Sequence, residues 1–156
     1  MKTLIVYESY FGNTEKVAQA IGKALGSGGA VSVVKSTDFA PSALQGVDLL
    51  VVGAPTRAFR PTEGIQKFLK DLTEGSLDGL RVASFDTRSD LSDVNIAFQF
   101  LMKKFGYAAE PVGKALEQKG GKLTLQPEGF YIKDIQGPLK DGELDRAGRW
   151  ATKMLV

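Results

Sequence analysis

The sequence predicts an α/β fold in which a parallel sheet of about five strands lies between two layers of helices, a three-layer sandwich. Short apolar runs alternate along the chain with segments whose apolar residues recur at helical spacing. The clearest run, 47–53, is almost continuously apolar, as expected for a strand covered on both faces of a parallel sheet. The length of 156 residues, without a repeat or linker, favours a single domain, 1–156.

The elements follow from these patterns in order. The apolar run 4–7 predicts the first strand, and Val17, Ala18, Ile21 and Leu25 form one apolar stripe of the helix that follows. Further strands are expected at 30–34, 47–53 and 80–85, and a split fifth strand at 123–125 and 130–132. Helices are expected at 62–72, 94–105, 108–119 and 143–155. Right-handed crossovers then allow the strand order 2-1-3-4-5.

Two of these helices carry aromatic side chains for which the sequence favours a place in the core. In 94–105, Phe98, Phe100 and Phe105 occur at helical spacing, which favours packing in the core over a role as a ligand platform. Trp150 of the closing helix is also expected to fill core, and Gly142 is suited to turn the chain before it.

Composition narrows the chemistry. The chain contains no Cys and no His, which excludes disulfides, thiolate nucleophiles, serine-type triads and most zinc sites, and so favours a borrowed cofactor. The formal net charge is +2 and the basic residues are scattered, which gives little support to a nucleic-acid surface. No apolar run approaches the ~20 residues that span a bilayer, and Glu8 interrupts the first run too early for a signal peptide. We therefore expect a cytoplasmic protein without membrane or nucleic-acid partners.

The loops that leave the first, third and fourth strands meet at the carboxyl edge of such a sheet, where ligands bind. The first loop ends at a helix N-terminus, whose free N–H groups and positive dipole end favour an anion. Neither a nucleoside-triphosphate loop nor a dinucleotide fingerprint occurs here, and no Lys or Arg lies between Lys2 and Lys16. The loop therefore suits one terminal phosphate held by neutral donors, although a plain helix cap at Asn13 or Thr14 is the alternative. The expected contacts are Ser9, Tyr10, Phe11, Gly12, Asn13 and Thr14.

At these residues the sequence resembles the flavodoxins, whose phosphate loop reads [Ser/Thr]-x-x-Gly-x-Thr after an apolar strand that ends in an aromatic residue. Gly53-Ala-Pro-Thr56 resembles the second flavodoxin loop, which carries flavin and ribityl contacts. The resemblance implies contacts from Pro55, Thr56, Arg57, Ala58 and Phe59. Phe59 is open to two interpretations, because it can lie against a flavin ring or pack on the protein itself.

The third loop departs from electron-carrier flavodoxins, which place a Gly-Asp segment and a stacking Tyr there. Phe85-Asp-Thr-Arg88 instead resembles a branch of small flavodoxin-family proteins, as do Pro127-Glu-Gly-Phe130 and the closing Gly-Pro-Leu-x-x-Gly-Glu-Leu segment that starts at Gly137. The resemblance implies further cofactor contacts from Asp86, Thr87 and Arg88, whereas the alternative is a structural ion pair between Asp86 and Arg88.

The resemblance covers nearly the whole chain and implies a flavodoxin-like fold that binds FMN without a covalent bond. It implies electron transfer with an as yet unknown redox partner protein, or a small FMN-dependent oxidoreductase, in which the flavin supplies the chemistry. The alternative is a non-redox binding protein on the same fold that has lost FMN.

Overall fold

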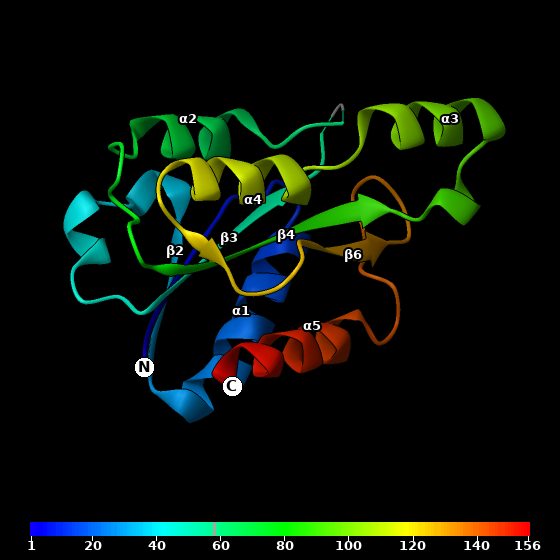
Figure 1. The fold of residues 1–156 in the computed structure, drawn as a ribbon. Coiled ribbons are helices and arrows are strands. Elements are labelled where there is room, and N and C mark those ends of the chain that lie inside the picture. The colour runs from blue at the N-terminus through cyan, green and yellow to red at the C-terminus, as the bar shows by residue number, and fades with distance from the viewer. Residues whose placement is uncertain (58) are drawn as a thin grey trace.

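The computed structural model describes residues 1–57 and 59–156 and shows a parallel sheet between two layers of helices (Figure 1). The order of its main strands is β2-β1-β3-β4-β5, as predicted. Helices α2 and α4 lie over one face of the sheet, and α1 and α5 lie over the other (Figure 1). The strands are β1 (Lys2–Tyr7), β2 (Ala30–Lys35), β3 (Leu49–Pro55), β4 (Arg81–Ser89), β5 (Lys122–Leu123) and β6 (Glu128–Ile132). The α-helices are α1 (Asn13–Leu25), α2 (Glu63–Asp71), α3 (Ile96–Phe105), α4 (Ala109–Gln118) and α5 (Glu143–Thr152).

The fifth strand is split, as the sequence predicts. β5 pairs with Arg81 and Val82 at the start of β4, and β6 pairs with the far end of the same strand. Both parallel segments thus complete one edge of the sheet.

The end of β4 differs from the prediction. Asp86, Thr87 and Arg88 were expected in a loop, but β4 continues to Ser89. The reason is β6, which runs parallel to this end of β4 and supplies hydrogen-bonding partners from Glu128 to Ile132. β3 likewise continues to Pro55, opposite Thr87. The site residues of β4 are therefore held on a strand, with less freedom than a loop would allow.

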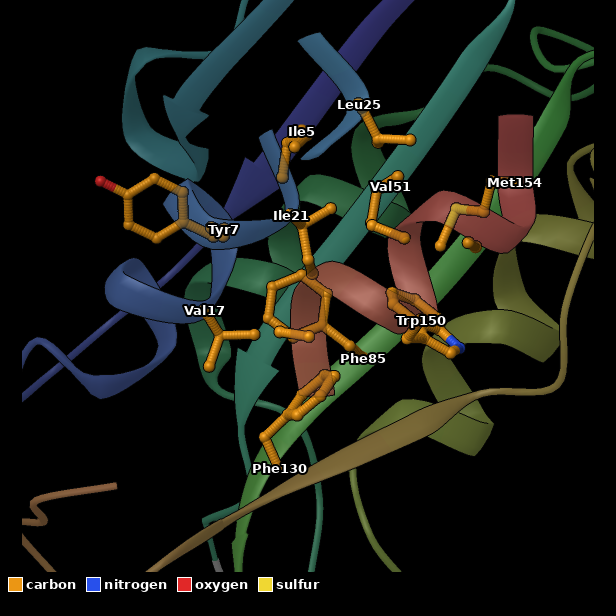
Figure 2. Packing of buried hydrophobic residues seen from close by; sticks show 14 of the residues in the cluster. Ile5, Tyr7, Val17, Ile21, Leu25, Val51, Phe85, Phe130, Trp150 and Met154 are labelled. Carbon is orange, nitrogen blue, oxygen red and sulfur yellow. The ribbon is translucent and has the colours of Figure 1, made fainter. Parts of the chain in front are cut away.

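Alternate residues of each central strand face opposite helical layers. Ile5 and Val51 face α1 and α5, where they meet Ile21 and Trp150 (Figure 2). The Trp150 ring lies 6.1 Å from that of Phe130, between centroids, in an edge-to-face arrangement. The prediction that Trp150 fills core is confirmed, since 5% of the residue is exposed. Burial of each such side chain contributes roughly 1.5–3 kcal/mol to folding, so this layer gives the site a rigid base.

The opposite face is built in the same way. Leu4, Val6, Leu50 and Val52 are buried against α2 and α4. Their strand positions alternate with those of the first face, so the two layers share one sheet. The closing Gly142 precedes α5 with φ of 82°, the left-handed turn that its sequence position suggested.

The prediction that the aromatic residues of α3 pack in the core is wrong. Phe100 and Phe105 are 64% and 57% exposed, and Phe98 is 39% exposed. Within α3, Met102 alone is buried among the described residues. α3 lies beyond the carboxyl end of β4 instead of over the sheet (Figure 1). Helical spacing predicts an apolar face, but a face is buried only where another layer lies against it.

No helix within 1–57 and 59–156 combines the length and apolar character that crossing a membrane requires.

Candidate functional site

The carboxyl ends of β1, β3 and β4 surround a cavity of about 340 Å³. This is where the strand order reverses and where parallel sheets of this kind bind ligands. The predicted site residues that line it are Ser9, Tyr10, Phe11, Asn13, Thr14, Pro55, Thr56, Arg57, Phe59, Thr87 and Arg88. The structure thus brings the three predicted segments together around one space.

The first segment is a turn followed by the N-terminus of α1. Gly12 has φ of 88°, a left-handed conformation that other residues adopt at a cost, and its N–H donates to Ser9 Oγ at 3.1 Å. The first hydrogen bond of α1 runs from Lys16 N–H to Gly12 O at 3.1 Å. The N–H groups of Tyr10, Phe11, Asn13 and Thr14 have no acceptor within the described ranges. The turn therefore offers several donors to an anion without offering a charge.

Side chains tie this turn to the rest of the site. The Asn13 amide donates to Gln136 O at 3.0 Å, which links the turn to the segment after β6. The hydroxyls of Thr14 and Thr87 lie 2.8 Å apart and join the turn to β4. Gly12 itself does not line the cavity, and its role is to shape the turn.

The second segment follows β3. Thr56 N–H donates to Thr87 O at 2.9 Å, and Thr56 Oγ1 accepts from Ala108 N–H at 3.0 Å. These two bonds fix the start of the segment between β4 and the start of α4. Arg57 and Arg60 then close a turn through paired backbone hydrogen bonds of 2.9 and 3.0 Å. Ala58, a further predicted contact, lies outside the described residues.

Aromatic rings surround the side chains of this second segment. The Arg57 guanidinium carbon lies 5.1 Å from the centroid of the Tyr10 ring and 5.7 Å from that of Phe11, within reach of a cation–π interaction. Phe59 has φ of 65° and packs against two rings of α3, with centroids 5.5 Å from Phe98 and 5.7 Å from Phe105. Phe59 therefore packs on the protein and also lines the cavity, so the two interpretations of this residue are compatible.

The third segment is dominated by a buried ion pair. The Arg88 guanidinium donates to both carboxylate oxygens of Asp86, at 2.6 and 2.7 Å, and lies 3.7 Å from the centroid of the Tyr107 ring. Gly129 makes this arrangement possible, because a Cβ there would sit 2.0 Å from Arg88 Nε. Asp86 also accepts from Ala109 N–H at 2.8 Å, at the start of α4. Asp86 lies behind the wall and does not line the cavity, so the alternative of a structural ion pair describes this residue.

Burial shifts the pKa values of the two partners in opposite directions. Burial raises the pKa of Asp86, although the Arg88 guanidinium and the Ala109 N–H oppose that rise. Burial by itself would lower the pKa of Arg88. The hydrogen bonds and the negative charge of Asp86 outweigh this effect, so the pKa of Arg88 is raised. Arg88 therefore stays charged, and Asp86 compensates most of that charge.

The lining combines apolar surface with cations. Arg57 and Arg88 line the cavity, and no Asp or Glu of the described chain does so. The sequence analysis missed five lining residues: Ser89, Phe98, Met102, Ile132 and Ile135. Phe98 was predicted to pack in the core, and Met102, which lies one helical turn later, carried no prediction of its own. Ile132 and Ile135 carried no signal, because β6 had to be paired with β4 before its end could be placed at the cavity.

Comparison with known proteins agrees with this architecture. The family model described as Flavodoxin matches residues 5–146. Among similar solved structures, a flavodoxin from the domain Archaea has a TM-score of 0.77 and 19% identity, over 99% of this chain and 96% of that chain. Oxidised flavodoxin 1 from Bacillus cereus has a TM-score of 0.76 and 17% identity, over 99% and 97%. Two-electron reduced Megasphaera elsdenii flavodoxin has a TM-score of 0.69 and 22% identity, over 97% and 98%. With the family model matched over most of its length, the chain belongs to the flavodoxin family.

Proposed function

We propose that the protein binds one FMN non-covalently at the cavity and transfers electrons through it. The observation that carries the proposal is the cluster of N–H donors at Tyr10, Phe11, Asn13 and Thr14 beside an apolar cavity of about 340 Å³. Donors at a helix N-terminus suit a phosphate, and an apolar space of this size suits part of a planar ring system. The bound flavin supplies the redox chemistry.

The chain's own residues have separable tasks in this proposal. The turn 9–14 holds the phosphate, with the hydroxyls of Ser9 and Thr14 as additional donors. The segment that starts at Thr56 and the end of β4 hold the ribityl chain and the edge of the ring. Phe59 and Phe98, which pack against each other and both line the cavity, provide an apolar surface that excludes water. A cytoplasmic location and a redox partner protein complete the proposal.

A ligand titration tests the proposal. Flavin-free protein is titrated with riboflavin, FMN and FAD, and binding is followed by flavin fluorescence. FMN is expected to bind more tightly than riboflavin, because only FMN carries the phosphate, and more tightly than FAD, because the turn has no cation for a second phosphate. Equal affinity for riboflavin and FMN contradicts the phosphate site, and protein that binds none of the three contradicts the proposed function.

A double variant tests the hydroxyls. Ser9→Ala with Thr14→Val is expected to weaken FMN binding by about 2–4 kcal/mol, because two hydrogen bonds to a charged group are lost. Riboflavin binding should change little. The matched control is Ser27→Ala with Thr152→Val, whose hydroxyls bond to backbone carbonyls at the other end of the sheet. Unchanged FMN affinity of the first variant would show that these hydroxyls only stabilise the turn.

A further inference from the structure

The exposed face of α3 is the most unusual surface of the molecule. Five of its large apolar residues are exposed, although a helix of a folded domain normally buries its apolar face. They are Ile96, Phe98, Phe100, Leu101 and Phe105. Tyr10 and Phe11, at the opposite lip of the cavity, are 49% and 45% exposed. Three of the exposed aromatic residues, Tyr10, Phe11 and Phe98, line the cavity, and Phe105 packs against Phe59, which also lines it.

Three of the segments around the opening carry charges of one sign. The segments 9–14, 54–60 and 94–106 contain four basic residues and no acidic residue. The four are Arg57, Arg60, Lys103 and Lys104. None of them forms an ion pair with another described residue, whereas nearby Lys140 is paired with Asp90 and Asp93. These three segments therefore combine an apolar surface with cations that lack an ion pair among the described residues, whereas the lining segment 132–135 adds the exposed acid Asp134.

We propose that this face, α3 with the lips of the cavity, is the docking surface for a redox partner protein whose own docking face is acidic around an apolar centre. The proposal rests on the proposed function, because it places the partner where electrons would leave the bound flavin. Unpaired cations steer an acidic surface toward the opening, and the aromatic residues of α3 lose water only in the docked complex.

The charge pattern also argues against a second copy of this chain as the occupant. In a two-fold dimer the same patch contacts itself, so four cations of one copy would face four of the other. Within the segments 9–14, 54–60 and 94–106, such a contact offers no acidic residue to compensate these cations. An acidic partner satisfies both the apolar and the charged part of the surface.

The test uses one haem protein in two charge states. Native cytochrome c is basic, and succinylation converts its lysine ammonium groups into carboxylates while the same haem is kept. Binding of each form to the protein is measured at low and at high ionic strength, with and without FMN. Electron transfer from the reduced, FMN-loaded protein to each form is then followed by stopped-flow absorbance. We expect the acidic form to bind and react faster at low salt, and the native form to show the opposite salt dependence.

Charge variants locate the surface. Lys103→Glu with Lys104→Glu is expected to slow the reaction with succinylated cytochrome c about tenfold at low salt. Lys103→Gln with Lys104→Gln should slow the reaction less. Because this variant adds no acid to the last turn of α3, it separates loss of the surface cations from destabilisation of the helix end by the two Glu residues. The control, Lys23→Glu with Lys153→Glu, has the same change in charge at the opposite end of the sheet and should match the parent. Phe100→Ser should slow the reaction at both salt concentrations.

Each outcome has one meaning. Faster reaction with native cytochrome c at low salt, or equal effects of the two Lys→Glu pairs, overturns the docking proposal while FMN binding stands. A dimer of the parent in sedimentation that is lost on Phe100→Ser overturns it in favour of self-association. Failure to bind FMN contradicts the proposed function alone, because binding of the two cytochrome forms is also measured on flavin-free protein.

Discussion

The two arginines on the cavity wall are held in very different ways. Arg88 lies in a buried niche: its side chain is 11% exposed, Asp86 binds it through two hydrogen bonds and Tyr107 stacks on it. Arg57 is exposed, and among the described residues its guanidinium lies against the rings of Tyr10 and Phe11 without an ion pair. The difference teaches that one cation serves the fold and the other is available to a ligand, although the sequence predicted both as cofactor contacts and offered an ion pair with Asp86 only as an alternative for Arg88.

Loss of each arginine should therefore affect stability to very different degrees. Arg88→Met leaves the buried carboxylate of Asp86 without its partner and is expected to lower the free energy of unfolding by about 3–5 kcal/mol. Arg57→Met should change it by less than about 0.5 kcal/mol, because the side chain is exposed. Urea denaturation of flavin-free protein measures both. Similar losses in the free energy of unfolding of the two variants would contradict the conclusion that only Arg88 serves the fold.

The pH dependence sharpens this prediction. Burial raises the pKa of Asp86, and without Arg88 the main opposing charge is gone. A carboxyl whose pKa is higher in the folded state than its ordinary 3.8 stabilises the fold below that value, and this contribution is lost as pH rises through the raised pKa. The difference in the free energy of unfolding between the parent and Arg88→Met should therefore become smaller as pH falls from 8 toward 4. The double variant Asp86→Asn with Arg88→Met has no carboxyl at this position. Its loss in the free energy of unfolding relative to the parent should be smaller and nearly independent of pH.

A side chain at position 129 would also displace Arg88, because Gly129 lies directly against the guanidinium group. Gly129→Ala places a Cβ where Arg88 Nε lies, so the guanidinium must move away from Asp86. We expect a loss of about 1–3 kcal/mol in the free energy of unfolding. Gly26→Ala is the control, since Gly26 has φ of −58° and no atom within 4 Å of the added Cβ. If both variants unfold like the parent, Arg88 does not depend on Gly129.

The smallest expected effect concerns the proposed cofactor. Arg57→Gln should lower the reduction potential of bound FMN by some tens of millivolts, because a cation on the wall favours the more negative, reduced flavin. Arg88→Gln should lower it less, because Asp86 can take up a proton and keep the net charge of the pair unchanged. Arg60→Gln should also have a smaller effect, since Arg60 does not line the cavity. A spectroelectrochemical titration measures all three, and equal shifts would contradict the assignment of Arg57 as the available cation.

The sequence predicted most of the fold because its signals are local. The apolar run 47–53 predicts a buried strand, and β3 (Leu49–Pro55) lies there; the loop 9–14 predicts a turn into a helix, and α1 starts at Asn13. Right-handed crossovers allowed the strand order 2-1-3-4-5 without knowledge of any contact, and the sheet has this order.

The sequence could not predict the features that depend on distant partners. Asp86 and Arg88 looked like loop residues because the strand that extends β4 lies some forty positions later, and only that pairing buries them. The aromatic residues of α3 looked like core because helical spacing predicts a face but not what covers it. Ile132 and Ile135 joined the cavity for the same reason, since their position depends on how β6 pairs.

The hydrogen bond from the Asn13 side chain to Gln136 O connects the start of the chain to a residue 123 positions later. During synthesis, the first loop leaves the ribosome long before its last support exists. A nascent chain that has only β1 to α4 carries the sequence of the turn 9–14 but lacks the carbonyl that anchors Asn13. Under the proposed function, the phosphate turn therefore gains this support only after the segment that follows β6 has been synthesised.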